Sequence, residues 1–505
     1  MHTRNSNPIS KRRVFLKQAM ALLTLPSMAS LGALMGVSKI AQASGPKYVL
    51  NVQEINGQQL YNGVSPGPTF RVKAGDNLDV DLHNSLSPLH DDCTDTPNGL
   101  HGLNTTNLHT HGLHVSPTTD STGEFDADNV FVSVVPEGQI VMCDDVCGSS
   151  TKTHFRWEKA NYRFELGDNH PSGTFWYHAH KHGSTARQVG DGMAGPLIVQ
   201  DRPGHLPEYI EKAPEKILMI MNKGIVLANP DGGGETDPVI KMRPGEVQRW
   251  RVINATGNGD QFLFLETNQP ELEIYQIAYD GLTLNKRFRI DSENFNEPWL
   301  NPASLASGNR MDLIVRAPVD GTFDSENSLF KQIVNLIDLL GNSARTQLKV
   351  EIDGEPVNHS WSDDDALPGP GITPFDDKSL PQRSIAFTRQ NSIDNEPFDG
   401  DVEQSMVLGT AEEWTVTNQT QAVHVYHIHV NPFFITHING IELAENDPLR
   451  RWQDTLGLPI TDGGEPASVT FKTRFEKFTG KFVIHCHVLR HEDNGMMQVV
   501  EIVEA

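Results

Sequence analysis

Ten of the 21 histidines in the chain fall into four short clusters, and the last cluster also contains a cysteine. The clusters are His109-Thr-His111, His178-Ala-His180, His424-Val-Tyr-His427-Ile-His429 and His485-Cys486-His487, followed by His491 and Met496. On a β-strand, residues i and i+2 point to the same face about 7 Å apart. Two imidazoles at this spacing can bind one metal ion or two neighbouring ions. One such pair is commonly a hydrogen-bonded core feature, but four pairs in one chain predict a metal centre.

The cysteine of the last cluster indicates which metal. Cys486 lies between His485 and His487, so it points to the opposite face of the strand. A thiolate, two imidazoles and a weak axial thioether are the ligands of a blue-copper electron-transfer site. Electrons collected at Cys486 can then leave through its backbone toward metals held by the neighbouring histidines. Zinc has no redox chemistry and needs no such arrangement.

In order and spacing, these clusters resemble those of the three-domain multicopper oxidases, and more closely the bacterial laccase-like members. The resemblance covers essentially the whole chain after residue 43, and all twelve ligand positions match. It implies four coppers per chain: type 1 at His424, Cys486, His491 and Met496; type 2 at His109 and His427; and a type 3 pair at His111, His178, His180, His429, His485 and His487. It also implies that a reducing substrate gives up single electrons at type 1 and that dioxygen is reduced to two waters at the other three coppers.

Reduction of dioxygen consumes protons, so a carboxylate near the coppers is needed as a relay. Glu492 directly follows His491 and matches the relay glutamate of the family. On the side where dioxygen would enter, we predict Asp128, with Asp120 and Asp126 as close alternatives.

A repeated strand pattern organises the chain. Gly75–Asn84, Gly245–Asn254 and Gly409–Asn418 each open with a turn glycine, alternate apolar and polar residues, and close on asparagine. Each predicts a half-buried antiparallel strand. Together they predict an all-β fold of three β-sandwich domains, which the resemblance makes cupredoxin-like with Greek-key topology. The expected limits are 44–205 for domain 1, 206–355 for domain 2, 356–380 for a linker and 381–505 for domain 3.

A second repeat joins the outer domains. Gly173–His180 and Gly480–His487 share glycine, phenylalanine and both histidines at the same offsets, whereas Gly321-Thr-Phe323 of the middle third lacks the histidines. We therefore assign the metals to domains 1 and 3 and expect domain 2 to serve as a spacer and pocket wall. The longest stretch with helical periodicity covers residues 326–340.

The first 43 residues carry the features of an export signal. Arg12 and Arg13 precede an apolar stretch, and Ala41-Gln-Ala43 has the small residues of a cleavage site. This segment resembles a twin-arginine signal, which directs already folded bacterial proteins across the membrane. A Sec signal and a retained anchor are the alternatives. We expect a periplasmic protein that uses the twin-arginine machinery and has no membrane span after cleavage.

Charge and cysteine content exclude several functions. The chain has 41 Lys and Arg against 65 Asp and Glu, for a net charge of −24, and such an acidic surface repels nucleic acid and anionic lipid. Four cysteines are too few for a disulfide scaffold. Beside Cys486, either Cys93 pairs with Cys143 or Cys147, or the latter two pair with each other.

The reducing substrate is the open question. An axial Met496 favours a lower type 1 potential and thus easily oxidised donors, such as electron-rich phenols, Fe(II) or Cu(I). No methionine lies between Met311 and Met406, so the methionine-rich insert of the cuprous-oxidase branch is absent. Asp493 is available as an acidic ligand for iron, but one carboxylate does not make a ferrous site.

The main hypothesis is a laccase-like oxidase of phenolic and aromatic donors. The alternatives are a metallo-oxidase for Fe(II) or Cu(I) and a copper-free cupredoxin-fold scaffold of the cell envelope. Chain length and the third and fourth histidine clusters disfavour a two-domain copper nitrite reductase. The remaining eleven histidines, including His101, His114, His182 and His437, are expected to be structural or surface residues.

Overall fold

The computed structural model describes most of the chain after residue 44. The described ranges are 45–92, 98–141, 154–257, 263–267, 272–290, 301–319, 330–338, 346–375, 379–389, 391–458 and 466–505. The export signal and Cys93, Cys143 and Cys147 lie outside these ranges, so both expectations remain predictions. Among the described residues, no helix has the length and apolar character that a membrane span requires.

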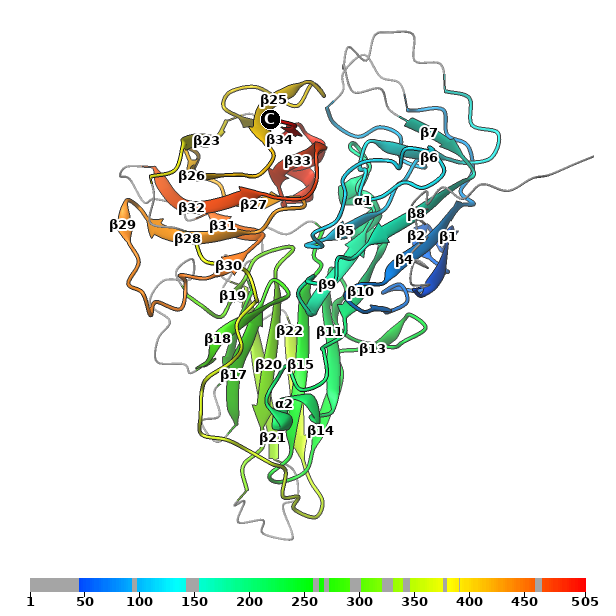
Figure 1. The fold of residues 1–505 in the computed structure, drawn as a ribbon. Helices are drawn as coiled ribbons and strands as arrows, with labels where there is room; N and C mark the ends of the chain where they lie inside the picture. The colour runs from blue at the N-terminus through cyan, green and yellow to red at the C-terminus, as the bar shows by residue number, and fades with distance from the viewer. Residues whose placement is uncertain are drawn as a thin grey trace, which may run out of the picture. The chain divides into compact units, whose positions relative to one another are not determined.

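The fold is all-β, as predicted, and its strands form pairs of stacked sheets. The helices of the described ranges are short: α1 (Thr185–Asp191), α2 (Glu208–Glu211) and α3 (Leu489–Asp493). Figure 1 shows the strands in three groups along the chain, coloured blue to cyan, green, and yellow to red. Each group draws its strands from one of the three predicted domain ranges, whose exact limits remain a prediction.

The first group contains two four-stranded sheets and a two-stranded one. Their strand orders are β2 (Gln58–Tyr61), β1 (Lys47–Ile55), β4 (Asn77–Asn84), β8 (Lys159–Glu165); β3 (Phe70–Val72), β10 (Ala194–Val199), β9 (Gly173–His178), β5 (His109–His111); and β6 (Val132–Val135), β7 (His154–Trp157).

The middle group contains a seven-stranded and a five-stranded sheet. Their strand orders are β13 (Gly234–Thr236), β12 (Gly224–Ala228), β11 (Glu215–Met221), β15 (Val247–Asn254), β20 (Arg310–Arg316), β17 (Glu273–Tyr279), β18 (Leu282–Arg289); and β14 (Val239–Met242), β22 (Thr346–Ile352), β21 (Phe330–Asp338), β16 (Leu263–Thr267), β19 (Ser304–Leu305). Strand β21 overturns the helical periodicity read over residues 326–340. Pairing with β16 and β22 satisfies its backbone, and this long-range pairing outweighs the local pattern.

The last group again contains two sheets. Their strand orders are β24 (Ser392–Ile393), β23 (Gln382–Thr388), β26 (Thr410–Asn418), β32 (Ala467–Phe475), β28 (Phe433–Ile438), β29 (Ile441–Glu442), with β30 (Trp452–Gln453) beside β28; and β25 (Val402–Val407), β34 (Met497–Val503), β33 (Gly480–Cys486), β27 (His424–Ile428), β31 (Thr455–Leu458).

The three copies of the repeated pattern are β4, β15 and β26, and each lies beside the first strand of its group. The glycine before each strand has a positive φ, between 75° and 88°, which explains the choice of residue. Each strand pairs antiparallel with one neighbour but parallel with the first strand of its group, so the expectation of purely antiparallel pairing was wrong. In each group the first strand pairs with its hairpin partner on one side and with the repeated strand on the other. The alternation of residues along a strand does not reveal which neighbour it will have.

Strand β15 also departs from the expected half-burial. Strands β4 and β26 alternate between buried and partly exposed residues, whereas every residue of β15 is buried. Its polar face carries Arg249 and Arg251, whose guanidinium groups donate to the carboxylate of Asp312 at 2.7 and 2.8 Å. Thr174 of β9 donates to the same carboxylate. The polar face of β15 is therefore covered by the strand that leads to His178.

Candidate metal centre

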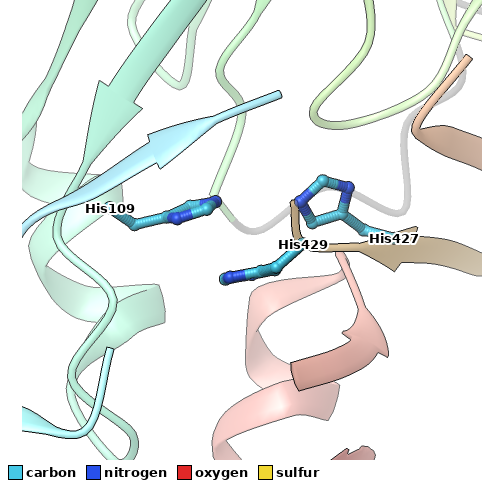
Figure 2. Close-up of side chains that lie close together, drawn as sticks. All are labelled: His109, His427 and His429. Carbon is cyan, nitrogen blue, oxygen red and sulfur yellow. The ribbon is translucent and has the colours of Figure 1, made fainter. Parts of the chain in front are cut away.

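Four strand segments bring eight imidazoles of the sequence clusters together. Strand β5 pairs with β9 so that His109 lies opposite His178, and β27 pairs with β33 so that His427 lies opposite His485. The two strand pairs face each other. The rings of His109 and His429 stack at 3.8 Å between centroids, and those of His111 and His427 stack at 3.9 Å. Figure 2 shows His109 on β5 pointing toward His427 and His429, which come from β27 and the residue after it.

The remaining histidines of the clusters complete this group. His180 and His429 place their Nε2 atoms 3.2 and 3.3 Å from Nε2 of His485. The ring of His487 lies 4.9 Å from that of His111 and 5.6 Å from that of His178. All eight side chains are buried. The structure therefore brings together every histidine expected at the type 2 and type 3 coppers.

Hydrogen bonds on the outer side of these rings test whether the group fits metal ions. Nδ1 of His178 donates to the carbonyl of Ala179 at 2.8 Å, and Nδ1 of His427 donates to the carbonyl of Asp454 at 2.9 Å. His485 makes the equivalent bond to Cys486. With the proton on Nδ1, Nε2 keeps its lone pair for a metal. Among the described residues, the Nε2 atoms of His109, His111, His178, His427 and His487 are buried and have no hydrogen-bond partner, as expected of atoms that bind metal.

Burial keeps these imidazoles in the form that binds metal. Desolvation lowers the pKa of His180 to about 3 and that of His427 to about 4. It also holds the pKa values of the other six well below the usual value. Neutral imidazole is the form that coordinates metal ions. The donor set of buried, neutral imidazoles fits copper.

Cys486 occupies the opposite face of β33, as strand alternation requires. Its Sγ lies 3.6 Å from Nδ1 of His424 and 3.7 Å from Nδ1 of His491. The Cys486 N–H donates to the carbonyl of Met496 at 3.0 Å, so the β33–β34 connection returns the methionine to the same apolar core. Nε2 of His424 donates to Thr420 Oγ1 at 2.8 Å, which leaves Nδ1 facing the thiol. The four residues expected at type 1 are thus assembled, and His491 is the partly exposed one.

The structure separates the three aspartates that the sequence left open. Asp128 is buried, and its carboxylate lies 3.0 Å from Nδ1 of His109. Desolvation raises its pKa to about 7, against the opposing effect of hydrogen bonds from Thr110. Asp126 instead forms a two-pronged ion pair with Arg156, and exposed Asp120 accepts bonds from its own loop. Only Asp128 of these three contacts a candidate ligand.

Glu492 and Asp493 lie side by side at the other end of the histidine group. Glu492 is buried, with Oε1 3.6 Å from Nδ1 of His180 and Oε2 3.8 Å from Nδ1 of His485. Burial, reinforced by the charge of Asp493, holds its pKa well above the usual range. Asp493 accepts the N–H groups of Gly183, Thr185 and Ala186 at the start of α1. Asp493 thus ties α3 to the start of α1, while its carboxylate also lies within 4.8 Å of ligand atoms of His182 and Glu492. Its availability as an iron ligand stays a prediction.

Comparisons with known proteins agree with this geometry. Two family models, both described as multicopper oxidase, match residues 143–204 and 373–505. The chain is similar to a multicopper oxidase of Staphylococcus aureus (23% identical, covering 88% of this chain and 83% of the relative) and to a laccase of Bacillus subtilis (24% identical, covering 88% and 90%). Its fold matches that of a Campylobacter jejuni multicopper oxidase described as a metallo-oxidase, with a TM-score of 0.62 at 20% identity over 91% of both chains. The chain is a multicopper oxidase.

Membership in this family makes the oxidase a copper-dependent oxidoreductase. The non-enzymatic scaffold considered from the sequence is therefore set aside. His101, His114, His182 and His437 each contact neighbouring backbone or side chains within the fold, and their structural role stays a prediction.

A second set of residues lies around the histidines of the oxidase, and sequence reasoning missed it. Arg310 from β20 is fully buried and donates to both oxygens of Asp454, at 2.8 and 2.6 Å, and its Nη1 lies 3.1 Å from Nδ1 of His111. Its backbone N–H donates to Asp280. Arginine and aspartate are too common for these positions to stand out in one sequence. Strands β17 and β20 pair with each other, and Asp280 and Arg310 then form hydrogen bonds with Asp454, just before β31. These contacts make the three residues a group.

Proposed function

We propose that the oxidase takes electrons from phenolic and other aromatic donors at one copper and passes them to three further coppers that reduce dioxygen to water. The ligands are those expected from the sequence: His424, Cys486, His491 and Met496 at type 1, and the eight other histidines at types 2 and 3. Bound copper supplies the one-electron redox steps that protein side chains do not provide. The observation that carries the proposal is the end of strand β33, where Cys486 points to one face and His485 and His487, the residue after the strand, point to the other.

The residues of β33 also provide a short path between the two copper sites. Cys486 is bonded through its backbone to both histidines, and its carbonyl accepts a hydrogen bond from His485 Nδ1 at 3.2 Å. The donor would meet the chain at His491, the one partly exposed imidazole of the type 1 group. The thiol itself is fully buried, so water is excluded from it.

Two carboxylates are placed to move the protons that dioxygen reduction consumes. Glu492 lies beside His180 and His485, and burial raises its pKa well above the usual range. Asp128 lies beside His109 at the other end of the group. We assign both as proton relays, since a group poised between its two protonation states is suited to that task.

The central test is replacement of the type 1 thiolate. Cys486→Ser removes the sulfur that gives the copper its intense visible absorption, so the colour and phenol oxidation should be lost together. Copper at the histidine group should remain, measured as metal per chain and as electron paramagnetic resonance of the remaining ions. Phenol oxidation at the wild-type rate in a colourless variant would disprove the proposed route.

A metallo-oxidase acting on Fe(II) or Cu(I) is the second candidate. Segment 394–403 carries exposed acidic residues, which favour binding of a metal cation. The Phe398 N–H in this segment donates to the carbonyl of Gly495, so the segment lies close to Met496 of the proposed type 1 site. Relatives of both kinds exist, since one similar structure is described as a metallo-oxidase and one similar sequence as a laccase. Comparison of kcat/KM for a dimethoxyphenol, Fe(II) and Cu(I) decides between them. A clear preference for a metal ion would replace the phenol proposal.

We propose that the oxidase is exported to the periplasm through the twin-arginine machinery. The support is Arg12-Arg13, the apolar stretch after it and Ala41-Gln-Ala43. A paired Arg12→Lys, Arg13→Lys variant should leave the chain in the cytoplasm with residues 1–43 still attached. Cell fractionation and mass spectrometry measure both. Export of this variant at the wild-type level would favour the Sec route.

A further inference from the structure

The middle third of the chain reaches the histidine group through one turn. Residues 306–309 connect β19 to β20, and this turn is closed by a hydrogen bond from the Asn309 N–H to the carbonyl of Ala306 at 3.0 Å. The Gly308 carbonyl accepts bonds from Trp176 Nε1 at 3.3 Å and from Arg310 Nη1 at 3.1 Å. The turn is therefore held against β9, the strand that ends at His178.

Ser307 contacts one of the candidate copper ligands directly. Its Oγ lies 2.6 Å from the carbonyl of Thr256 and 3.2 Å from Nδ1 of His487, and all three residues are buried. The hydroxyl has one proton, and the carbonyl can only accept, so that proton points to Thr256. Toward His487 the oxygen must then accept, which requires the proton of the imidazole to be on Nδ1. The buried Nε2 atom of His487, which has no hydrogen-bond partner in the part of the chain that the structure describes, is left as the metal-binding atom.

Gly308 fixes how close the turn comes to the imidazoles. It has φ of +94°, and a Cβ atom there would lie 2.9 Å from Nε2 of His111 and 3.2 Å from His487. Any side chain at this position would press on two candidate ligands at once. The backbone of the middle third is thus packed directly against the imidazoles contributed by the outer two.

We propose that Ser307 is a positioning residue of the copper centre: it fixes the tautomer and orientation of His487 from the middle domain. This inference rests on the proposed copper function and changes the expected role of domain 2. That domain is not only a spacer, because it supplies a hydrogen-bond acceptor that one ligand of the type 3 pair needs. Hydrogen bonds of this kind to a ligating histidine typically change metal affinity or activity by about 10- to 100-fold.

The test compares Ser307→Ala with Ser304→Ala in the copper-loaded chain. Ser304 is also buried in domain 2, and its carbonyl, which the substitution retains, accepts a hydrogen bond from Tyr279. Ser307→Ala should lose copper to a chelator about 10- to 100-fold faster than the wild type. The thiolate absorption at Cys486 and the thermal unfolding midpoint should stay unchanged. Ser304→Ala should match the wild type in all three measurements.

A second pair of variants keeps the result decisive. Ser307→Cys retains a group that can accept weakly, so its rate of copper loss should lie between those of the wild type and Ser307→Ala. Gly308→Ala should displace both His111 and His487 and release more copper than Ser307→Ala. Equal rates of copper loss in the wild type and a folded Ser307→Ala would overturn the assignment of Ser307. Absence of bound copper in the wild type would instead contradict the proposed function itself.

Discussion

At the scale of single residues, the copper sites depend on which nitrogen of each histidine carries the proton. Backbone carbonyl groups at the ends of strands accept hydrogen bonds from the Nδ1–H groups of His178, His427 and His485. His424, a proposed type 1 ligand, has the opposite arrangement, because Thr420 accepts from its Nε2. In the proposed copper sites, the neighbours of each histidine therefore decide which of its nitrogens is left for the metal.

Thr420 gives a prediction about the type 1 copper. Its hydroxyl donates to Asn418 Oδ1 at 2.9 Å, so it accepts from His424 Nε2 and fixes the ring with Nδ1 toward Cys486. Thr420→Val keeps the shape and removes the acceptor. We expect the affinity for the type 1 copper or the rate of phenol oxidation to fall by about 10- to 100-fold. A shifted visible absorption band measures the change at the copper.

Thr415→Val is the matched control for this prediction. Thr415 lies on β26, in the same domain, and its hydroxyl bonds only with Thr470 among the interactions described. The control should keep the wild-type absorption and activity. If Thr415→Val and Thr420→Val change the spectrum equally, the hydrogen bond to His424 does not orient the ring.

At the scale of elements, the repeated asparagine explains why three strands share one pattern. The side-chain oxygen of Asn84 accepts the N–H two residues later, and Asn254 and Asn418 do the same. Their amide groups donate to carbonyls of other segments: Asn104 and Val134, Leu305, and Ala422, respectively. The carbonyl bonded by Asn254 belongs to Leu305, two residues before Ser307. The carbonyl bonded by Asn418 belongs to Ala422, two residues before His424. The asparagine therefore positions segments that lead to the metal centre.

Sequence patterns predicted the elements with local signals and missed those defined by contacts. The strands that carry His109, His178, His427 and His485 follow from the spacing of their histidines. The parallel pairs formed by β4, β15 and β26 depend on distant strands, and the burial of β15 depends on Asp312 and Thr174. Neither leaves a trace in the alternation of a ten-residue stretch. Ser307 was missed for the same reason, since a lone serine has no pattern.

The loop that enters β9 gives a prediction about pH. His170 is buried between two hydrogen bonds, since its Nδ1 donates to Pro171 and its Nε2 accepts the N–H of His114. His114 in turn donates from Nδ1 to the carbonyl of Val430, which joins the first and last thirds of the chain. A proton on His170 Nε2 would break the hydrogen bond from the His114 N–H. Burial disfavours the charged imidazole and lowers the pKa of His170 to about 3.

The sign of the effect on stability follows from this lowered pKa. Below about pH 6.5 the unfolded chain binds a proton at His170 that the folded chain does not bind, so stability falls with falling pH until about pH 3. Between pH 8 and pH 5 the loss due to His170 amounts to about 2 kcal/mol. His170→Gln can keep both hydrogen bonds and does not titrate, so its free energy of unfolding should fall less over this range. Denaturant unfolding at both pH values measures the difference.

A histidine outside this chain of hydrogen bonds serves as the control. His205 is partly exposed, and His205→Gln should retain the pH dependence of the wild type. If His170→Gln also retains it in full, His170 is not a source of the acid sensitivity.

At the scale of the whole molecule, the metal centre requires all three parts of the chain. The outer thirds supply the twelve candidate ligands, and the middle third supplies Ser307 and Arg310. Arg310 is buried between Asp280 of its own third and Asp454 of the last, and removal of one partner of such a group typically costs about 3–5 kcal/mol. The sequence suggested a spacer because only histidine, cysteine and methionine were visible as ligands. Residues that orient ligands are of ordinary types and become visible only when their contacts are known.

The net charge of −24 gives a prediction about how donors reach the oxidase. An acidic molecule attracts cationic donors and repels anionic ones, and salt screens this effect. The screening length falls from about 30 Å at 0.01 M to about 8 Å at 0.15 M ionic strength. Over this range, kcat/KM should fall several-fold for a phenol with a quaternary ammonium group and rise for a sulfonated phenol. A neutral phenol of the same ring substitution is the control and should change little.

The response of the three phenols also distinguishes charge steering from an effect of salt on the copper centre. Steering acts on the encounter, so it changes kcat/KM and leaves kcat nearly constant for each phenol. Damage to the centre by salt would lower kcat for all three alike. Exposed acidic residues in 394–403 lie near Met496, because this segment forms a backbone hydrogen bond with Gly495. We therefore expect kcat/KM of the cationic phenol to depend most strongly on salt. Neutralising them as Asp399→Asn and Asp401→Asn should remove part of its salt dependence, whereas an unchanged dependence would assign the attraction to the remaining surface.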